Sequence, residues 1–254
     1  MLQVSADIWL PPLSKQYLGT VSLALADQDG MYAGNDSHYL FCGASALNVI
    51  LGSLHVAGAQ DPATILDFGA GAGRVTRWLR AGFPTAEIHT CDIRAGDVDF
   101  CAAQFGTRSW WSGTDIASLS APAKYDLVWV GSVVTHLSAD RTLALMNKLV
   151  SWTNLNGLVL MSFHGRFSVF AQESGQVRYI DDEAWMQIKA EYANRGYGYA
   201  DYKGCSGYGI SLTKLSWIAD MVQRRADLRL ITMSEQAWDN HHDILAVQVR
   251  SATG

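Results

Sequence analysis

Short apolar runs alternate with amphipathic segments through the middle of the chain. The runs are bounded by Gly, Pro and Asn and have the length of buried strands. Strands are predicted at residues 65–68, 86–91, 107–111, 125–131 and 157–163. Because a helix-length crossover separates successive strands, we expect them to run parallel. The pattern predicts an α/β fold built on one doubly wound sheet.

Apolar residues recur at three-to-four spacing between these strands, as in helices that bury one face. A helix is expected after the first strand, where Val75, Trp78 and Leu79 share a face. Ser37 is the expected N-cap of the helix at 38–57, and Ser138 suits the first turn of the helix at 138–152. Further helices are predicted at residues 98–106, 182–195 and 213–225.

Three parts of the chain are distinguished by pattern. Residues 1–60 are predicted to form an N-terminal helical extension, and residues 61–254 the main domain. Within that domain, residues 164–212 leave the strand–helix alternation and include the Gly/Tyr-rich stretch 196–209, too aromatic for a flexible linker. We expect 164–212 to form an ordered insertion that covers a substrate. The stretches 228–232 and 244–249 are predicted to be paired strands.

Three alternating glycines, Gly69, Gly71 and Gly73, follow the first strand. Glycine lets a backbone approach a bound molecule where a Cβ would clash, and α/β sheets bind nucleotide-like ligands at such strand ends. A dinucleotide fingerprint, G-x-G-x-x-G, would need its third glycine at Arg74. The spacing is instead G-x-G-x-G, with Asp67 two residues before the first glycine.

The loop and three later segments resemble class I S-adenosylmethionine (SAM) methyltransferases. The segments "ILDFGAGAGRVTRWL", "CDIRAGDVDFCAAQFG", "YDLVWVGSVVTHLS" and "GLVLMSFHGR" are similar to bacterial small-molecule methyltransferases encoded beside glycan-biosynthesis genes, over roughly residues 30–165. The resemblance implies a seven-stranded, mostly parallel, Rossmann-like sheet with an antiparallel last strand, and SAM as the cofactor.

An acidic residue roughly twenty positions past the glycines can accept both ribose hydroxyls of an adenosyl group. Asp92 ends the second strand, where the resemblance places this acid. Asp115 matches a position that contacts the adenine amino group in the family, although a plain loop aspartate explains it equally well. The cofactor-binding set implied is Asp67, Gly69, Ala70, Gly71, Arg74, Asp92, Ile93, Asp115 and Gly131.

Composition narrows the function classes. A net charge of −5 argues against a sequence-independent nucleic-acid binder. The four cysteines are scattered without a C-x-x-C pair, so we expect no zinc site of that kind and free thiols in a reducing cytoplasm. No signal peptide is recognised, and no apolar run of about eighteen residues is expected to span a membrane.

Methyl transfer needs alignment of two reactants and, for a hydroxyl acceptor, removal of a proton. A general base contributes about 10²- to 10⁴-fold. His136 follows the fourth strand and His164 the fifth, so either is a candidate base; the plain alternative for His136 is a loop residue that caps the next helix. Tyr39, Tyr208 and His242 are candidate contacts to a small hydroxylated acceptor.

The run His241-His242-Asp243 contains two potential metal ligands or a base with its orienting carboxylate. Adjacent side chains on an extended segment point to opposite faces, which disfavours a joint metal site. The stretch 131–137 also lacks the carboxylates of metal-dependent O-methyltransferases. We therefore expect no metal.

Three functions are compared. The first is a SAM-dependent methyltransferase acting on a hydroxyl oxygen of a sugar-like or other hydroxylated metabolite. The second is a non-catalytic scaffold subunit with the same fold, and the third, disfavoured by the glycine spacing, is a nicotinamide-dependent oxidoreductase. Methylation of a nucleic-acid base is disfavoured because residues 131–134 are Gly-Ser-Val-Val and not a Pro-Pro-aromatic motif.

Overall fold

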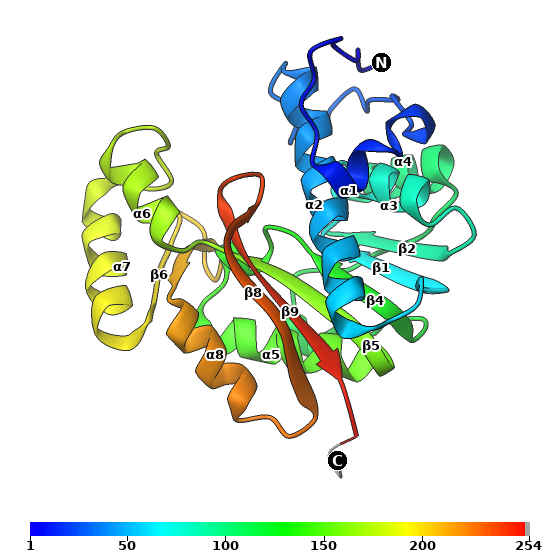
Figure 1. Cartoon of the computed structure of the whole chain (residues 1–254). Helices are drawn as coiled ribbons and strands as arrows, with labels where there is room; N and C mark the ends of the chain where they lie inside the picture. Colours follow the sequence, from blue (N-terminus) through cyan, green and yellow to red (C-terminus); the bar gives the residue numbers. More distant parts are fainter. Residues whose placement is uncertain (252–254) are drawn as a thin grey trace. The chain divides into compact units, whose positions relative to one another are not determined.

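The computed structural model describes residues 1–251 and divides into two compact units, with the boundary between Trp129 and Val130. The first unit contains α1 (Pro12–Lys15), the 3-10 turn Leu18–Thr20, α2 (Asp36–Ala57), β1 (Thr64–Phe68), α3 (Thr76–Gly82), β2 (Glu87–Asp92), α4 (Ala95–Phe105), β3 (Arg108–Trp111), the 3-10 turn Ile116–Ser118 and β4 (Tyr125–Val130). The second contains the 3-10 turn Val134–His136, α5 (Ala139–Trp152), β5 (Thr153–Phe163), α6 (Arg166–Glu173), α7 (Asp182–Arg195), β6 (Tyr197–Asp201), β7 (Gly209–Thr213), α8 (Leu215–Gln223), β8 (Leu228–Trp238) and β9 (His242–Val249) (Figure 1).

The strand order of the seven-stranded sheet is β3-β2-β1-β4-β5-β9-β8. β1 pairs in parallel with β2 and β4, and β2 pairs in parallel with β3. β9 is antiparallel to both β5 and β8. The predicted fold class, a mostly parallel Rossmann-like sheet with an antiparallel last strand, is confirmed.

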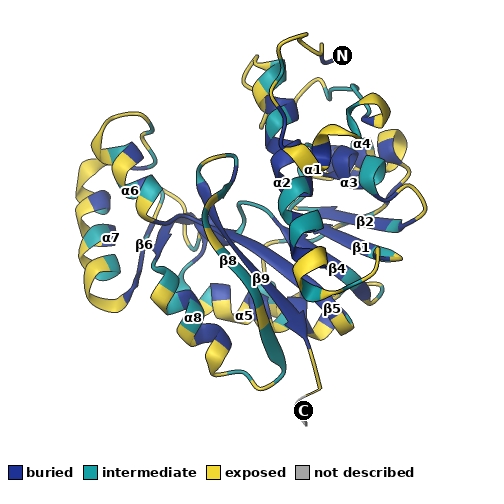
Figure 2. Cartoon of the chain, in the orientation of Figure 1, coloured by how far each residue is buried: buried dark blue, intermediate teal, exposed yellow. Residues whose placement is uncertain are grey.

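Helix α2 packs closely on α3 in the first unit. A Cβ at Gly43 would lie 2.3 Å from the Arg74 carbonyl oxygen and 2.3 Å from Trp78 Cδ1, so a larger residue would push the helices apart. The predicted N-cap, Ser37, is wrong: the Asn35 side chain accepts a 3.0 Å hydrogen bond from the His38 amide and starts the helix two residues earlier. The strands β1 and β2 are dark with buried residues (Figure 2).

Helix α2 also corrects the expectation that no segment is apolar enough to cross a membrane. It has 22 residues and a mean hydropathy of 1.6 over its most apolar 18. Over that window 56% is buried inside the protein, and Leu40, Leu47 and Ile50 are fully buried. The helix has the burial of a core helix, because its apolar residues already have protein neighbours.

The Gly/Tyr-rich stretch 196–209, expected to be an ordered loop, contains strand β6 and leads into strand β7. β6 and β7 pair antiparallel in a separate two-stranded sheet. A Cβ at Gly198 would lie 2.0 Å from the Ile188 carbonyl oxygen, so glycine is required for β6 to lie against α7. The apolar core between α7 and this two-stranded sheet comprises Ile180, Trp185, Ile188, Ala200, Ile210 and Leu212. The predicted insertion 164–212 therefore holds α6, α7 and this hairpin.

The antiparallel strands of the second unit are longer than predicted. β5 begins at Thr153, four residues before the predicted strand at 157–163, and Asn156 has a positive φ of 66° within it. β8 extends to Trp238. Pairing with β9 accounts for the extension of β8, because Met233, Ser234 and Trp238 have partners in β9 that complete backbone hydrogen bonds.

Candidate functional site

The glycine loop after β1 takes a conformation that few other residues adopt. Gly69, Gly71 and Gly73 have φ of 74°, 52° and 79°. The Gly69 and Ala70 amides both donate to the Cys91 carbonyl oxygen, at 2.9 and 3.1 Å, which ties the loop to the end of β2. A Cβ at Gly73 would lie 2.3 Å from Phe105 Cε2. At Gly71 the nearest atom to such a Cβ is Met31 Cγ, 4.0 Å away, so the middle of the loop has open space beside it.

Asp92 lies at the end of β2, beside that open space. Its Oδ2 accepts a 2.8 Å hydrogen bond from the Gly71 amide, and its Oδ1 accepts a 3.0 Å bond from the Arg94 amide. A carboxylate has about four acceptor positions, so two remain for hydroxyl donors. The loop therefore orients an acidic acceptor.

Asp67, predicted to bind the cofactor, lies beneath the loop with only 2% of its surface exposed. The Thr76 hydroxyl donates to its Oδ2 at 2.6 Å. Burial raises the pKa of Asp67 to about 7, and the hydrogen bond from Thr76 acts against that shift. Asp67 thus connects β1 to the start of α3 through its hydrogen bond with Thr76.

The segment before α2 is tied to the loop region through Arg77. This buried guanidinium donates to the Ser22 and Ala24 carbonyl oxygens, at 2.9 and 2.7 Å. The Tyr39 hydroxyl bonds to the Asp29 carboxylate and Arg77 lies over its ring at 5.0 Å, so Tyr39, a predicted substrate contact, is 2% exposed and anchors the N-terminal segment. Burial raises the pKa of the Tyr39 hydroxyl.

The remaining candidate residues of the first unit are Ile93, Asp115 and Arg74. Ile93 is 52% exposed, and Trp111, which donates from Nε1 to the Ile93 carbonyl oxygen at 2.9 Å, is 65% exposed. Trp111 therefore presents its ring at the surface beside Ile93. Asp115 is exposed and caps the 3-10 turn Ile116–Ser118 by accepting from the Ala117 amide. Arg74 is half-buried, 6.0 Å above the Tyr39 ring.

In the second unit, His136 lies among the tyrosines of the β6–β7 hairpin. Its Nδ1 is 2.8 Å from the Gly209 carbonyl oxygen, and the Tyr202 hydroxyl is 3.3 Å from the same nitrogen. The Tyr208 ring stacks on the imidazole, with centroids 4.9 Å apart and planes 29° apart. Burial lowers the pKa of His136, and the Gly209 hydrogen bond partly opposes this. Gly131, another predicted site residue, directly follows β4 and is half-buried.

His164 lies at the end of β5, and its ring stacks with two others. Its centroid is 5.5 Å from that of His241 and 4.9 Å from that of His242. Burial lowers the pKa of His164 well below its usual range, and the charges of His241 and His136 add to the effect.

The argument that His241 and His242 point to opposite faces is wrong. Their rings stack at 4.7 Å, with planes 22° apart. Asp239 and Asn240 have φ of 56° and 51°, and the His241 amide donates to the Trp238 carbonyl oxygen at 3.1 Å. Positive φ at both central residues is typical of a type I′ hairpin turn. His241 thus belongs to the turn, where strand alternation does not apply.

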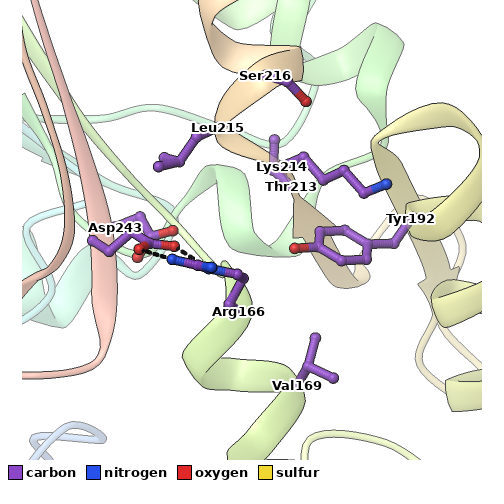
Figure 3. Close-up of a pocket in the computed structure, with 9 residues that line it drawn as sticks. Arg166, Val169, Tyr192, Thr213, Lys214, Leu215, Ser216 and Asp243 are labelled. Carbon is purple, nitrogen blue, oxygen red and sulfur yellow. Dashed lines mark hydrogen bonds and ion pairs between the residues drawn. The ribbon is translucent and has the colours of Figure 1, made fainter.

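A cavity of about 480 Å³ opens in the second unit among α6, α7, α8 and β9 (Figure 3). In Figure 3 the Arg166 guanidinium extends toward the acidic side chains, where it pairs with Glu235, and the Tyr192 hydroxyl turns toward the middle of the cavity. Burial raises the pKa of Asp243 to about 6. A Cβ at Gly165 would lie 1.8 Å from Asp243 Oδ2, so glycine is required there. No periodic pattern in the sequence predicts this cavity.

Comparison with known proteins finds a family match over a segment that includes the glycine loop. Residues 66–159 match the family described as a methyltransferase domain. The malonyl-[acyl-carrier protein] O-methyltransferase of Anoxybacillus flavithermus is 31% identical over 108 residues, which span 42% of this chain and 40% of that protein.

Two solved structures have the same fold at low identity. Magnesium protoporphyrin IX methyltransferase from Synechocystis, with bound S-adenosylhomocysteine (SAH), has a TM-score of 0.54 at 15% identity, covering 85% of this chain and 87% of that one. The 1,6-didemethyltoxoflavin-N1-methyltransferase from Burkholderia thailandensis, with its substrate and SAH, has a TM-score of 0.56 at 12% identity, covering 84% and 80%.

Residues 66–159 therefore match a methyltransferase domain, and the chain shares its fold with methyltransferases crystallised with SAH. The first unit has features that fit SAM, the methyl donor from which SAH forms. Open space beside Gly71 leaves room for a ligand near the backbone. The two free acceptor positions of Asp92 match a ribose diol, which offers two hydroxyl donors.

Proposed function

We propose that the protein is a SAM-dependent methyltransferase that methylates a hydroxyl oxygen of a small, sugar-like or otherwise hydroxylated metabolite. The observation that carries this proposal is the hydrogen-bonding state of His136. An oxygen acceptor must lose a proton during transfer, so a histidine held ready to take one favours a hydroxyl substrate.

The Gly209 carbonyl oxygen can only accept, so Nδ1 of His136 carries the proton in this hydrogen bond, 2.8 Å long. In the neutral ring Nε2 then holds the lone pair. Burial keeps the ring neutral by lowering its pKa. When bound, SAM supplies an electrophilic methyl group, and the role of His136 is to take the acceptor's hydroxyl proton at Nε2.

Tyr208 and Tyr202 supply the surface on which an acceptor would rest. Tyr208 is 48% exposed even though its ring stacks on His136. A tyrosine combines a flat apolar face with a hydroxyl tip, which suits a ring that carries hydroxyl groups. The resemblance to methyltransferases encoded beside glycan-biosynthesis genes supports a sugar-like acceptor in the same way.

For the cofactor, we propose that Asp92 accepts from the ribose and that Gly69, Ala70 and Gly71 present backbone beside it. Ile93 and Trp111 would provide apolar surface for the adenine, with Asp115 near its amino group. Asp67 and Tyr39 would act indirectly, through the loop and the N-terminal segment. A cytoplasmic location fits the four cysteines, which are free thiols in the structure.

The proposal is tested by presenting purified protein and SAM with panels of hydroxylated, amine and carboxylate metabolites. Transfer is followed by SAH release, and mass spectrometry with NMR locates the new methyl group. We expect turnover with a hydroxylated acceptor and the methyl on its oxygen. Methylation of nitrogen or carbon would contradict the oxygen assignment. SAH binding without turnover on any panel would favour the scaffold function instead.

A further inference from the structure

Three histidines of the second unit bring their ring nitrogens together. Each of His164, His241 and His242 offers one nitrogen, and these three atoms lie within 4.8 Å of one another. His164 directly follows β5, His241 lies in the β8–β9 turn and His242 is the first residue of β9, so pairing of β5 with β9 brings them together. His164 is 4% exposed and His242 8%, which shields the cluster from bulk water.

The hydrogen bonds around two of the rings leave nitrogens for a ligand. Nδ1 of His164 is buried without a hydrogen-bond partner among residues 1–251, while the ring is also bonded to the Ser211 backbone. Nε2 of His241 bonds to the Tyr179 hydroxyl. A metal-bound histidine usually has this arrangement, with one nitrogen on the metal and the other oriented by a neighbouring oxygen.

We propose that His164, His241 and His242 form a binding site for a divalent transition-metal ion of the Zn²⁺ class. Imidazole nitrogens suit this class of ion, and zinc sites with three histidines keep a fourth position for water or another oxygen. Tetrahedral ligands at 2.0–2.1 Å from zinc lie about 3.3 Å apart, so small side-chain rotations close the gap from 4.8 Å. An unpartnered buried nitrogen is otherwise costly, and coordination satisfies it.

Tyr179 is a positioning residue for this site. Its hydroxyl holds the His241 ring, and its own ring lies 4.9 Å from that of His164. Removal of such an outer partner typically lowers metal affinity by about 10- to 100-fold. Tyr179→Phe is therefore expected to weaken metal binding while the three ligands remain.

The test is calorimetric titration of Zn²⁺ into chelator-stripped protein without SAM or acceptor, so its outcome does not depend on methyl transfer. Cys205, an exposed thiol, is replaced by serine in every variant to remove a competing ligand. We expect one strong site per chain, affinity at least 100-fold lower in His164→Gln and His241→Gln, and no change in His55→Ala, an exposed histidine of α2.

Co²⁺ provides a second measurement, because its visible absorption reports the ligand geometry directly. We expect an intense tetrahedral spectrum in the wild type that His241→Gln abolishes while circular dichroism stays unchanged. His241 lies in a half-buried turn, so this variant is the one that best preserves the fold. Absence of a strong Zn²⁺ site in the wild type, or equal Zn²⁺ affinity in His241→Gln, would overturn the proposal.

Discussion

The glycine loop of the first unit is surrounded mainly by backbone polar groups. The candidate residues His136 and His164 of the second unit are instead surrounded mainly by histidine and tyrosine side chains. The Gly69 and Gly71 amides and one carboxylate, Asp92, shape the loop region. Around His136 and His164, ring stacking and one backbone carbonyl set the geometry. The loop conformation therefore has a local cause, its glycines, whereas the histidine positions depend on contacts between segments distant in the sequence.

The largest effect is expected at His136. His136→Ala removes the proposed base, so kcat on the identified acceptor should fall by about 10²- to 10⁴-fold. SAH affinity, measured by calorimetry, should stay within threefold, because the ribose and loop contacts lie in the first unit. His55→Ala, an exposed histidine, serves as the control. Near-normal kcat in His136→Ala would mean that alignment alone accounts for catalysis.

The next largest effect is expected at Asp92, in the first unit. Asp92→Ala should remove two charge-assisted hydrogen bonds to the ribose, each about 1.5–3 kcal/mol, and weaken SAH binding at least about 100-fold. Asp99→Ala removes an exposed carboxylate from α4 and is expected to leave the affinity unchanged. A change of less than threefold in Asp92→Ala would show that the ribose lies elsewhere.

Gly73→Ala tests whether the loop conformation is required sterically. The new Cβ would approach Phe105 Cε2 to 2.3 Å at a φ of 79°, so overpacking of about 1–3 kcal/mol adds to backbone strain. Gly106→Ala is the matched control, because its φ is 61° and nothing lies within 4 Å of its Cβ. Chemical denaturation should show a larger loss of unfolding free energy for Gly73→Ala. Equal losses would mean that the contact with Phe105 relaxes without cost.

A further effect is a pH dependence of stability from Asp67. Its pKa is raised to about 7 in the folded state, against about 3.9 when unfolded. Ionisation therefore lowers stability progressively as the pH rises from about 4 to about 7, and the full loss persists above that range. Asp67→Asn should have its largest gain in melting temperature over wild type above pH 7 and little gain near pH 4. A pH-independent difference would contradict the raised pKa.

The core strands and the glycine loop are predictable because their signals are local. Apolar runs mark β1, β2 and β4, and the G-x-G-x-G spacing with Asp92 predicts where a ribose would bind. The β6–β7 hairpin was missed because Tyr and Gly at 196–209 also fit an ordered loop, and only packing of Gly198 on α7 selects a strand. The stacking of His241 on His242 does not follow from strand alternation, because the Asp239-Asn240 turn places His241 outside the strand.

The central claim, that the glycine loop binds SAM and not a nicotinamide dinucleotide, is tested most directly by parallel calorimetric titrations of the wild-type protein with SAH and with NADH. The account predicts one SAH site per chain, with no heat of binding from NADH at the same concentrations. Tight NADH binding without SAH binding would contradict it.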